Sequence, residues 1–551
     1  MNHVPDYVSV FVRTPEILKD LPKGWVEIDR DGVRVLCTRT HPGFSGTILS
    51  STLQRPVEVP IFMSRGNSND SRVVPWTWFF RDYYGQDPQP IDSNHDWRTG
   101  ATTIALVGGA NHINPNATLT AVDAGDEARH VFRVLERHPA LGQLAEGIKI
   151  PFCGRFEPFQ IDGFRPLLED QDGHGGVFVR SSPTKSVVYG FDPIQSLWWD
   201  SRNDREAASS SQNANWISLL IRSITWAAPF ISWKGFWPSD IPPLIYSIDT
   251  EAGSGYYDPG SRSCVWAVGR RFASRRLDMK TQFSVRTAAR RLERRGLIGS
   301  FFVDLNAVRD QEDWLALAEI GRDHDISLHM PRIGNHEAWK QLVTNRDATR
   351  KALKEAIDVL THRTGPPVGF RYPSWHRESN THDSLAIMNL GYDSSSLAHP
   401  PFLVVPYRMF SSTSGEPLDL WEFPCVEAIG AVKAGPSPLK GARTRRRLAV
   451  EIQRYIETCA DFGGLAVLCD HDMALGAARG HVHGTWRLDP HGLRSILRTA
   501  QQMTKSSRLR PMRGSEFLRW WTGTRQIRLE PRCERGDGEW KLTIAIRPGG
   551  N

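Results

Sequence analysis

The sequence predicts an α/β protein in which a distorted parallel (β/α) barrel follows a separate α/β domain. Two observations predict this fold. From residue 241 onward, short apolar strand patterns alternate with amphipathic helix patterns, as in strand–helix units around a parallel sheet. Polar residues also follow several of these strands, which is where barrels of this kind carry their chemistry.

The predicted domain boundaries follow from length and turn signals. The chain has 551 residues, too many for one ordinary core, so several domains are expected. Prolines within residues 238–243 precede a fresh strand pattern and mark a boundary. We therefore assign residues 1–240 to an accessory α/β domain of unknown role and residues 241–522 to the barrel. Residues 523–551, which contain a Gly-Asp-Gly turn, predict a C-terminal β-hairpin.

The barrel region contains regular alternating elements. Apolar runs predict strands at residues 244–248, 299–303, 326–328, 368–370 and 465–468. Amphipathic patterns predict helices at residues 285–296, 314–320, 348–360, 385–390, 448–459 and 493–503. Gly296 is placed to end the first of these helices at its C-cap.

The first domain has a weaker pattern. Short apolar runs predict strands at residues 103–107, 148–152, 177–179 and 187–189. Residues 124–138 predict a helix, and residues 216–237 predict a buried, Trp-rich helical segment rather than a membrane contact. The segment Gly173 to Pro193 faintly resembles the closing strands of flavodoxin-like, glutamine-amidotransferase-like domains. Neither a nucleophilic cysteine elbow nor a phosphate loop accompanies it, so we expect a noncatalytic accessory or binding role.

Composition and charge restrict the partners. The formal charge of +7 is a mild excess for this length and forms no sharp basic patch, so no nucleic-acid partner is expected. The seven cysteines are scattered without a CxxC pair, which argues against a disulfide framework and a thiolate zinc site. The N-terminus shows no signal peptide, and no clean apolar run of about 18 residues occurs. These features predict a cytoplasmic protein without a membrane span.

Polar side chains collect where the predicted strands end. They are Asp249 and Glu251 after the first strand, His329 after the third, Arg371 after the fourth, and Asp470, His471 and Asp472 after a late strand. Taken singly, an Asp after a strand is more often a helix or turn cap, and a lone His is more often structural. The ordered set of carboxylate, imidazole and guanidinium groups instead favours metal-assisted hydrolysis at the mouth of the barrel.

Short motifs occur in a fixed order through this region. They are Ser-Ile-Asp-Thr-Glu at 247–251, Gly-Ser-Phe-Phe-Val at 299–303, His-Asp-Ile-Ser-Leu-His at 324–329, Gly-Phe-Arg-Tyr-Pro-Ser at 369–374, Gly-Tyr-Asp-Ser-Ser at 391–395, Trp-Glu-Phe-Pro at 421–424 and Val-Leu-Cys-Asp-His at 467–471. From about residue 244 to 522, the chain resembles the NodB-like polysaccharide deacetylases of carbohydrate esterase family four. The resemblance implies a deacetylase barrel with a divalent metal ion.

The resemblance also implies catalytic roles. Asp249 would be the general base that activates water, and Arg371 would pair with it, orient it and hold it ionised. His471 would be the general acid that protonates the departing amine. The carboxylates that could hold the His471 ring in its working tautomer are Asp470, Asp472 and Glu422.

The implied metal ligands are Glu251, His329 and His336, with zinc as the expected ion and other divalent ions left open. Two departures from the family pattern leave alternatives. Thr250 separates the two acids, which are adjacent in the family, so either Glu251 or Asp249 could bind the metal. The family's second histidine lies four residues after the first, where this chain has isoleucine. A longer loop would have to bring His336 to the metal, or the site is weak or lacks metal.

The expected function is metal-dependent hydrolysis of an N-acetyl or other amide group on a carbohydrate or sugar-containing substrate. We expect Tyr372, Trp375 and Trp421 to bind the substrate. One alternative is an amide hydrolase that acts on a small molecule other than a sugar. Another is a noncatalytic polysaccharide-assembly or binding protein with a degenerate site. The sequence does not predict an oligomeric state.

Overall fold

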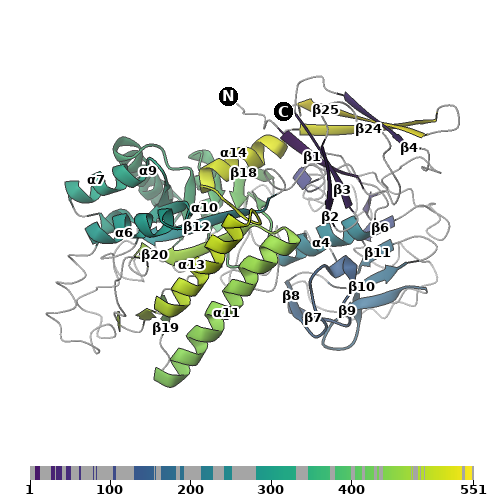
Figure 1. Ribbon diagram of the computed structural model, residues 1–551, viewed down its shortest axis with the longest axis horizontal. Coiled ribbons are helices and arrows are strands. Elements are labelled where there is room, and N and C mark those ends of the chain that lie inside the picture. Colours follow the sequence, from purple (N-terminus) through teal and green to yellow (C-terminus); the bar gives the residue numbers. More distant parts are fainter. Residues whose placement is uncertain are drawn as a thin grey trace. The chain divides into compact units, whose positions relative to one another are not determined.

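A computed structural model of the chain is shown in Figure 1. It describes residues 7–12, 26–30, 33–39, 45–50, 61–63, 79, 82–83, 103–106, 129–153, 156, 163–181, 186–191, 213–227, 241–250, 281–308, 310–330, 345–372, 379–398, 404–411, 416–426, 431–433, 438–472, 475, 482–483, 486–488, 490–525, 527–535 and 540–548. The chain divides into two compact units. The first unit consists of Met1–Trp199, Asn215–Asp240 and Arg519–Asn551, and the second consists of Asp200–Ala214 and Ile241–Leu518.

The second unit is built on a curled, mostly parallel sheet. In spatial order its strands are β17 (Tyr407–Phe410), β18 (Pro417–Glu422), β16 (Tyr392–Asp393), β15 (Gly369–Arg371), β14 (Asp325–His329), β13 (Gly299–Val303), β12 (Pro243–Thr250) and β20 (Ala466–His471), with β23 (Arg510–Pro511) also paired to β12. The β17–β18 pair is antiparallel, and the other pairs are parallel. The predicted distorted barrel of parallel strands is confirmed.

Two isolated bridges draw the ends of this sheet together. Leu397, which follows β16, pairs in parallel with Cys425, and Val426 pairs in parallel with Leu468 of β20. The backbone N–H of Cys469 donates to the carbonyl oxygen of Val426 at 3.0 Å. The segment after β18 therefore lies against β20, and side chains from strands far apart in the sequence face one interior.

Helices cover the barrel strands (Figure 1). They are α6 (Thr281–Glu293), α7 (Gln311–Ile320), α9 (Arg346–Arg363), α10 (Ser379–Ile387), α11 (Pro438–Phe462), α13 (Pro490–Lys505) and α14 (Gly514–Arg525). Each helix predicted for this region is present, with ends that differ by a few residues except at α10 and α11, which begin at Ser379 and Pro438 rather than at 385 and 448. In α9 the Asn345 side chain accepts from the backbone N–H of Ala348, and Leu353, Ala356 and Leu360 form the buried face.

The first unit contains a mixed seven-stranded sheet. Its order is β5 (Ile61–Met63), β6 (Thr103–Leu106), β11 (Ser186–Tyr189), β10 (Gly175–Arg180), β9 (Arg165–Glu169), β7 (Arg129–Val134) and β8 (Lys149–Cys153). The β5–β6 and β6–β11 pairs are parallel, and the other pairs are antiparallel, unlike the parallel sheet of a flavodoxin-like domain. Helix α4 (Asn213–Ala227) contributes Trp216, whose indole N–H donates to the carbonyl oxygen of Pro151 at 2.8 Å.

The helix predicted at residues 124–138 is wrong. Residues Arg129–Val134 form strand β7, which pairs antiparallel with β8. Phe132 and Val134 are buried, whereas Arg133 between them is exposed, so the burial repeats every second residue. The apolar residues in this stretch fit a helical face as well as a strand, and only the pairing partner distinguishes the two. Residues 124–128 lie outside the described residues.

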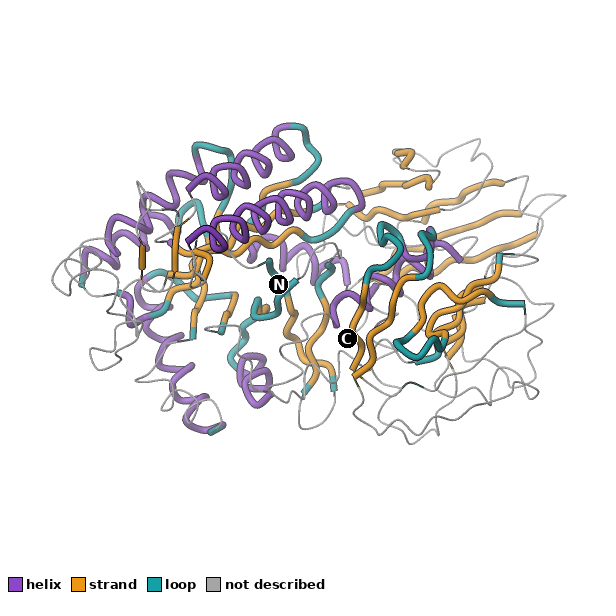
Figure 2. Tube along the Cα trace, turned by 90° about the horizontal axis from the view of Figure 1, so that it is seen from below, coloured by secondary structure: helices purple, strands orange, loops and turns teal. Residues whose placement is uncertain are grey.

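The predicted C-terminal hairpin pairs β24 (Ile527–Arg535) with β25 (Trp540–Pro548), and a strand from the other end of the chain joins it. Strand β4 (Ser45–Ser50) pairs antiparallel with β25 (Figure 1). Figure 2 shows the described helices and strands in a second view. An isolated two-stranded hairpin is marginally stable in water, so the third strand has a clear structural role.

Two small sheets complete the described strands: β1 (Tyr7–Val12), β3 (Val33–Arg39) and β2 (Val26–Arg30), and β19 (Ala431–Lys433), β22 (Trp486–Leu488) and β21 (Val482–His483). Among the described residues, no helix is long and apolar enough to cross a membrane.

Candidate active site

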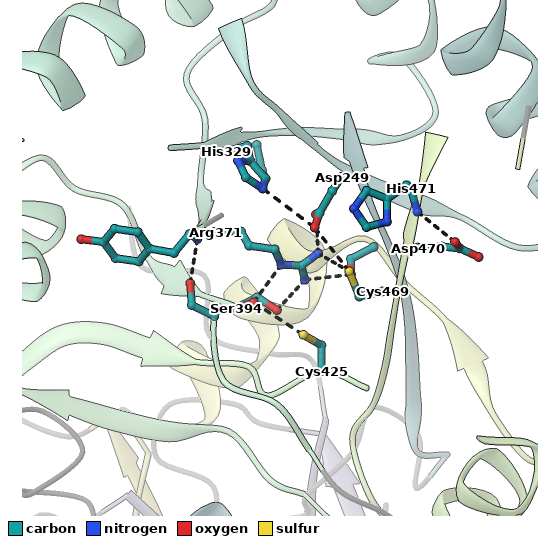
Figure 3. A network of polar contacts seen from close by, with 12 residues as sticks. Asp249, His329, Arg371, Ser394, Cys425, Cys469, Asp470 and His471 are labelled. Atoms are coloured by element: carbon teal, nitrogen blue, oxygen red, sulfur yellow. Dashed lines mark hydrogen bonds and ion pairs between the residues drawn. The ribbon is translucent and has the colours of Figure 1, made fainter. Parts of the chain in front are cut away.

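Arg371, the last residue of β15, lies fully buried inside the barrel and uses all five of its N–H donors (Figure 3). Its Nε donates to the carbonyl oxygen of Ser394 at 2.8 Å, Nη1 donates to Asp249 Oδ1 at 2.7 Å and to Cys469 Sγ at 3.1 Å, and Nη2 donates at 2.8 Å to the hydroxyls of both Ser247 and Ser394. Burial is the largest single influence and lowers the pKa of Arg371, but the Asp249 carboxylate and the Cys469 and Cys425 sulfurs together outweigh it and raise that pKa. The guanidinium is therefore a fixed cation at the centre of the site.

Strand alternation and register place its partners. Ser247 and Asp249 are two residues apart on β12, so they point to the same face. Across the parallel β12–β20 pair, Ser247 lies opposite Cys469 and Asp249 lies opposite His471. Four polar side chains from two strands therefore share the inner face of the barrel near its carboxyl end.

Asp249 is held through both carboxylate oxygens and is only 4% exposed. Oδ1 accepts from Arg371, and Oδ2 accepts from the thiol of Cys469 at 3.5 Å. The same Oδ2 lies 3.9 Å from Nε2 of His329. Burial raises the pKa of the Cys469 thiol well above its ordinary range, so this thiol remains a donor at neutral pH.

His329, the last residue of β14, has the geometry of a metal-binding imidazole. Its Nδ1 lies 3.3 Å from the carbonyl oxygen of Met330, so in the neutral ring Nδ1–H donates there. Nε2 then presents its lone pair toward Asp249. Two ligand atoms bound to one zinc ion at about 2.0–2.2 Å each lie no more than about 4.4 Å apart. The 3.9 Å separation of His329 Nε2 and Asp249 Oδ2 fits that limit.

His471, the last residue of β20, is partly exposed beside the buried base. Its backbone N–H donates to Asp470 Oδ1 at 2.9 Å, and the Tyr246 hydroxyl donates to Asp470 Oδ2 at 3.3 Å. Burial and the Asp470 carboxylate raise the pKa of Tyr246, which keeps that hydroxyl protonated. Asp470 and Glu422 were both predicted to orient the His471 ring. Asp470 instead accepts hydrogen bonds from the Tyr246 hydroxyl and the His471 backbone N–H. Glu422 Oε1 accepts from the backbone N–H of Ser396 at 2.8 Å.

The structure describes two of the three aromatic residues predicted to bind the substrate, and both are buried. Tyr372 and Trp421 are each 1% exposed. The Tyr372 hydroxyl donates to Thr381, and the guanidinium of Arg408 lies 4.5 Å from the centre of the Trp421 ring. These contacts explain both residues as packing elements, and their role toward a substrate stays a prediction. Trp375, Glu251 and His336 lie outside the described residues.

Several residues of this network were missed by the sequence analysis. Ser247 and Cys469 each precede a predicted catalytic residue by two positions, so strand alternation was the available signal. Ser394 lies in the Gly-Tyr-Asp-Ser-Ser motif, but only the fold shows that it binds Arg371 twice. Cys425, whose thiol lies 3.6 Å from the carbonyl oxygen of Ser394, had no such signal because it comes after β18.

Another group of potential metal ligands lies in the first unit. Ligand atoms of Asp170, Asp172 and His174 lie within 4.8 Å of one another in the turn between β9 and β10. Asp170 Oδ1 accepts from the backbone N–H groups of Asp172 at 3.0 Å and His174 at 2.8 Å. These bonds account for the cluster as a side-chain-stabilised turn.

No protein-family model matches the sequence, and no curated protein matches it. The solved structures that resemble this chain include polysaccharide deacetylases and a family-four carbohydrate esterase from Streptomyces lividans. A protein from Mycobacterium smegmatis, described as a candidate polysaccharide deacetylase, is 19% identical with a TM-score of 0.38, and the match covers 55% of this chain and 96% of that one. An allantoinase is 15% identical with a TM-score of 0.39 and coverages of 53% and 93%. A carbohydrate deacetylase named Agd3 is 11% identical with a TM-score of 0.29 and coverages of 85% and 87%.

Proposed function

We propose that the barrel is a metal-dependent hydrolase that removes an N-acetyl group, or cleaves another amide, on a carbohydrate or sugar-containing substrate. One observation carries the proposal. Oδ1 of Asp249 is bound by Arg371, its Oδ2 faces His329 at 3.9 Å, and His471 is its partner on the neighbouring strand. A base, a metal-binding imidazole and an acid at one barrel end are the groups that amide hydrolysis needs.

In the proposed reaction, Asp249, Arg371 and His471 have separate tasks. Oδ2 of Asp249 accepts a proton from the attacking water, while Arg371 keeps Oδ1 engaged and fixes the orientation of the carboxylate. His471 then donates a proton to the departing nitrogen, so that an amine rather than an amide anion leaves. The partial exposure of His471 suits this role, because the ring must reach the substrate.

The proposed metal ion is zinc, which would be held by His329, Glu251 and His336, while Oδ2 of Asp249 serves as the base. Such an ion would supply polarisation of the acyl carbonyl and electrostatic stabilisation of the developing oxyanion. His329 supports this assignment because its Nδ1 is directed at a backbone carbonyl and its Nε2 faces Asp249.

The test is amine release by the purified full chain from a panel of N-acetylated sugars and from amides that contain no sugar. We expect Asp249→Ala to abolish turnover, while His362→Gln, which changes an exposed residue at the end of α9, retains it. Loss of activity with a chelator and recovery with zinc would support the metal. Full activity of Asp249→Ala would overturn the assigned role of Asp249. Turnover confined to the non-sugar amides would replace the proposed substrate class.

A further inference from the structure

The Cys469 thiol lies between the two charged groups of the site and contacts both (Figure 3). It is 2% exposed. Nη1 of Arg371 donates to its sulfur at 3.1 Å, and its S–H donates to Oδ2 of Asp249 at 3.5 Å. Since Nη1 of Arg371 also donates to Oδ1, the guanidinium, the carboxylate and the thiol form a closed ring of hydrogen bonds.

We propose that Cys469 is a positioning residue for the Asp249–Arg371 pair and sets the direction in which the second oxygen of Asp249 points. This role rests on the proposed amide hydrolysis, because it concerns the oxygen that would accept the proton. Cys469 would act through the Asp249 carboxylate, to which its S–H donates, and is not itself the proton acceptor.

The number of donors on the guanidinium is the first argument. Arg371 carries five N–H groups, and oxygen atoms accept four of them. The sulfur of Cys469 accepts the fifth. An aliphatic side chain at this position would leave a charged N–H without an acceptor inside the barrel, which is costly.

The geometry of the ion pair is the second argument. Arginine and carboxylate groups frequently pair through two parallel N–H···O bonds. Here Arg371 reaches Asp249 only through Oδ1, because its other donors are taken by Cys469 and two serines. The thiol therefore blocks the two-point pairing and holds Oδ2 on the side of His329.

The backbone fixes the thiol itself. Cys469 lies opposite Ser247 in the β12–β20 pair, and its N–H donates to the carbonyl oxygen of Val426 at 3.0 Å. Strand β12 on one side and the segment at Val426 on the other therefore fix the backbone of Cys469, so its sulfur is in position before substrate binds.

The first test compares Cys469→Ala, Cys469→Ser and the matched control Cys459→Ala. Cys459 is also a fully buried thiol but lies on α11. We expect Cys469→Ala to lower kcat by about tenfold to hundredfold with little change in KM, as for a misplaced catalytic group. Cys469→Ser should recover part of the loss, because a hydroxyl both donates and accepts. Wild-type kcat in Cys469→Ala, or equal losses in the alanine and serine variants, would overturn the proposal.

The second test is independent of activity. The Raman S–H stretching band of Cys469 is obtained as wild type minus Cys469→Ser, and the same difference is taken in an Asp249→Asn background. We expect the band to move to higher frequency in that background, because a carboxamide accepts a weaker hydrogen bond than a carboxylate. An unmoved band would contradict the contact. If the wild type hydrolyses no amide while the band still moves, the proposed function fails and the positioning contact stands.

Discussion

Nη1 of Arg371 lies 2.7 Å from Oδ1 of Asp249, and the two side chains are 0% and 5% exposed. These residues are 122 positions apart in the sequence and come from strands β15 and β12. A buried ion pair is strongly destabilised when one partner is removed, because the other charge then lacks compensation. The Asp249–Arg371 ion pair therefore links strands β12 and β15 of the barrel and also orients the Asp249 carboxylate.

Replacing Arg371 with methionine should lower the free energy of unfolding by about 3–5 kcal/mol. The matched control is Arg286→Gln on α6, which breaks the partly exposed ion pair with Glu319 and should cost no more than about 1 kcal/mol. Urea denaturation monitored by circular dichroism measures both. Adding Asp249→Asn to Arg371→Met should restore part of the loss, since the uncompensated charge disappears. Similar small losses in both single variants would contradict the structural role of the pair.

His471→Gln should lower kcat by about 10²–10⁴-fold, the range for loss of a general acid. The fold should persist, because the ring is partly exposed at a strand end. The sharper measurement compares an N-acetyl sugar amine with an anilide, whose amine leaves more readily. The anilide should be affected far less. Equal loss on the two substrates would show that His471 does not act as the acid.

His329→Ala should reduce the amount of zinc that the protein retains after dialysis, because its Nε2, directed at Asp249, is the proposed imidazole ligand. Asp170→Asn, which alters the carboxylate of the other ligand cluster, should leave that amount unchanged. Elemental analysis of the dialysed proteins measures the difference. Zinc loss in Asp170→Asn but not in His329→Ala would move the metal site out of the barrel.

We expect the raised pKa of the buried Cys459 thiol to lower the free energy of unfolding at high pH. Burial raises the pKa of its thiol from 9.0 to about 12. Between these values the unfolded chain loses the proton while the folded chain keeps it, so the free energy of unfolding decreases as pH rises, by about 1.4 kcal/mol per pH unit for this group. Urea denaturation at several pH values from 8 to 11 should give a shallower decline for Cys459→Ala than for the wild type. Parallel curves would contradict the raised pKa.

The sequence by itself determined the strand–helix order of the barrel and the strand-end positions of Asp249, His329, Arg371 and His471. Such features are local, because alternation and helical spacing leave their mark within a few residues. The same local signal failed at residues 129–134. There the apolar spacing fitted a helix, and pairing with β8 decided for a strand.

Only the tertiary structure decided which groups meet. Residues 247, 249, 371, 394 and 469 converge because parallel strands from distant parts of the chain curl around one interior. The sequence marked Tyr372 and Trp421 as aromatics near motifs, but burial depends on neighbouring elements, and here they pack inside. The role of Cys469 likewise depends on a guanidinium whose fifth donor it accepts and a carboxylate to which it donates. Local pattern therefore placed the charges at the strand ends, and long-range pairing decided how they are oriented.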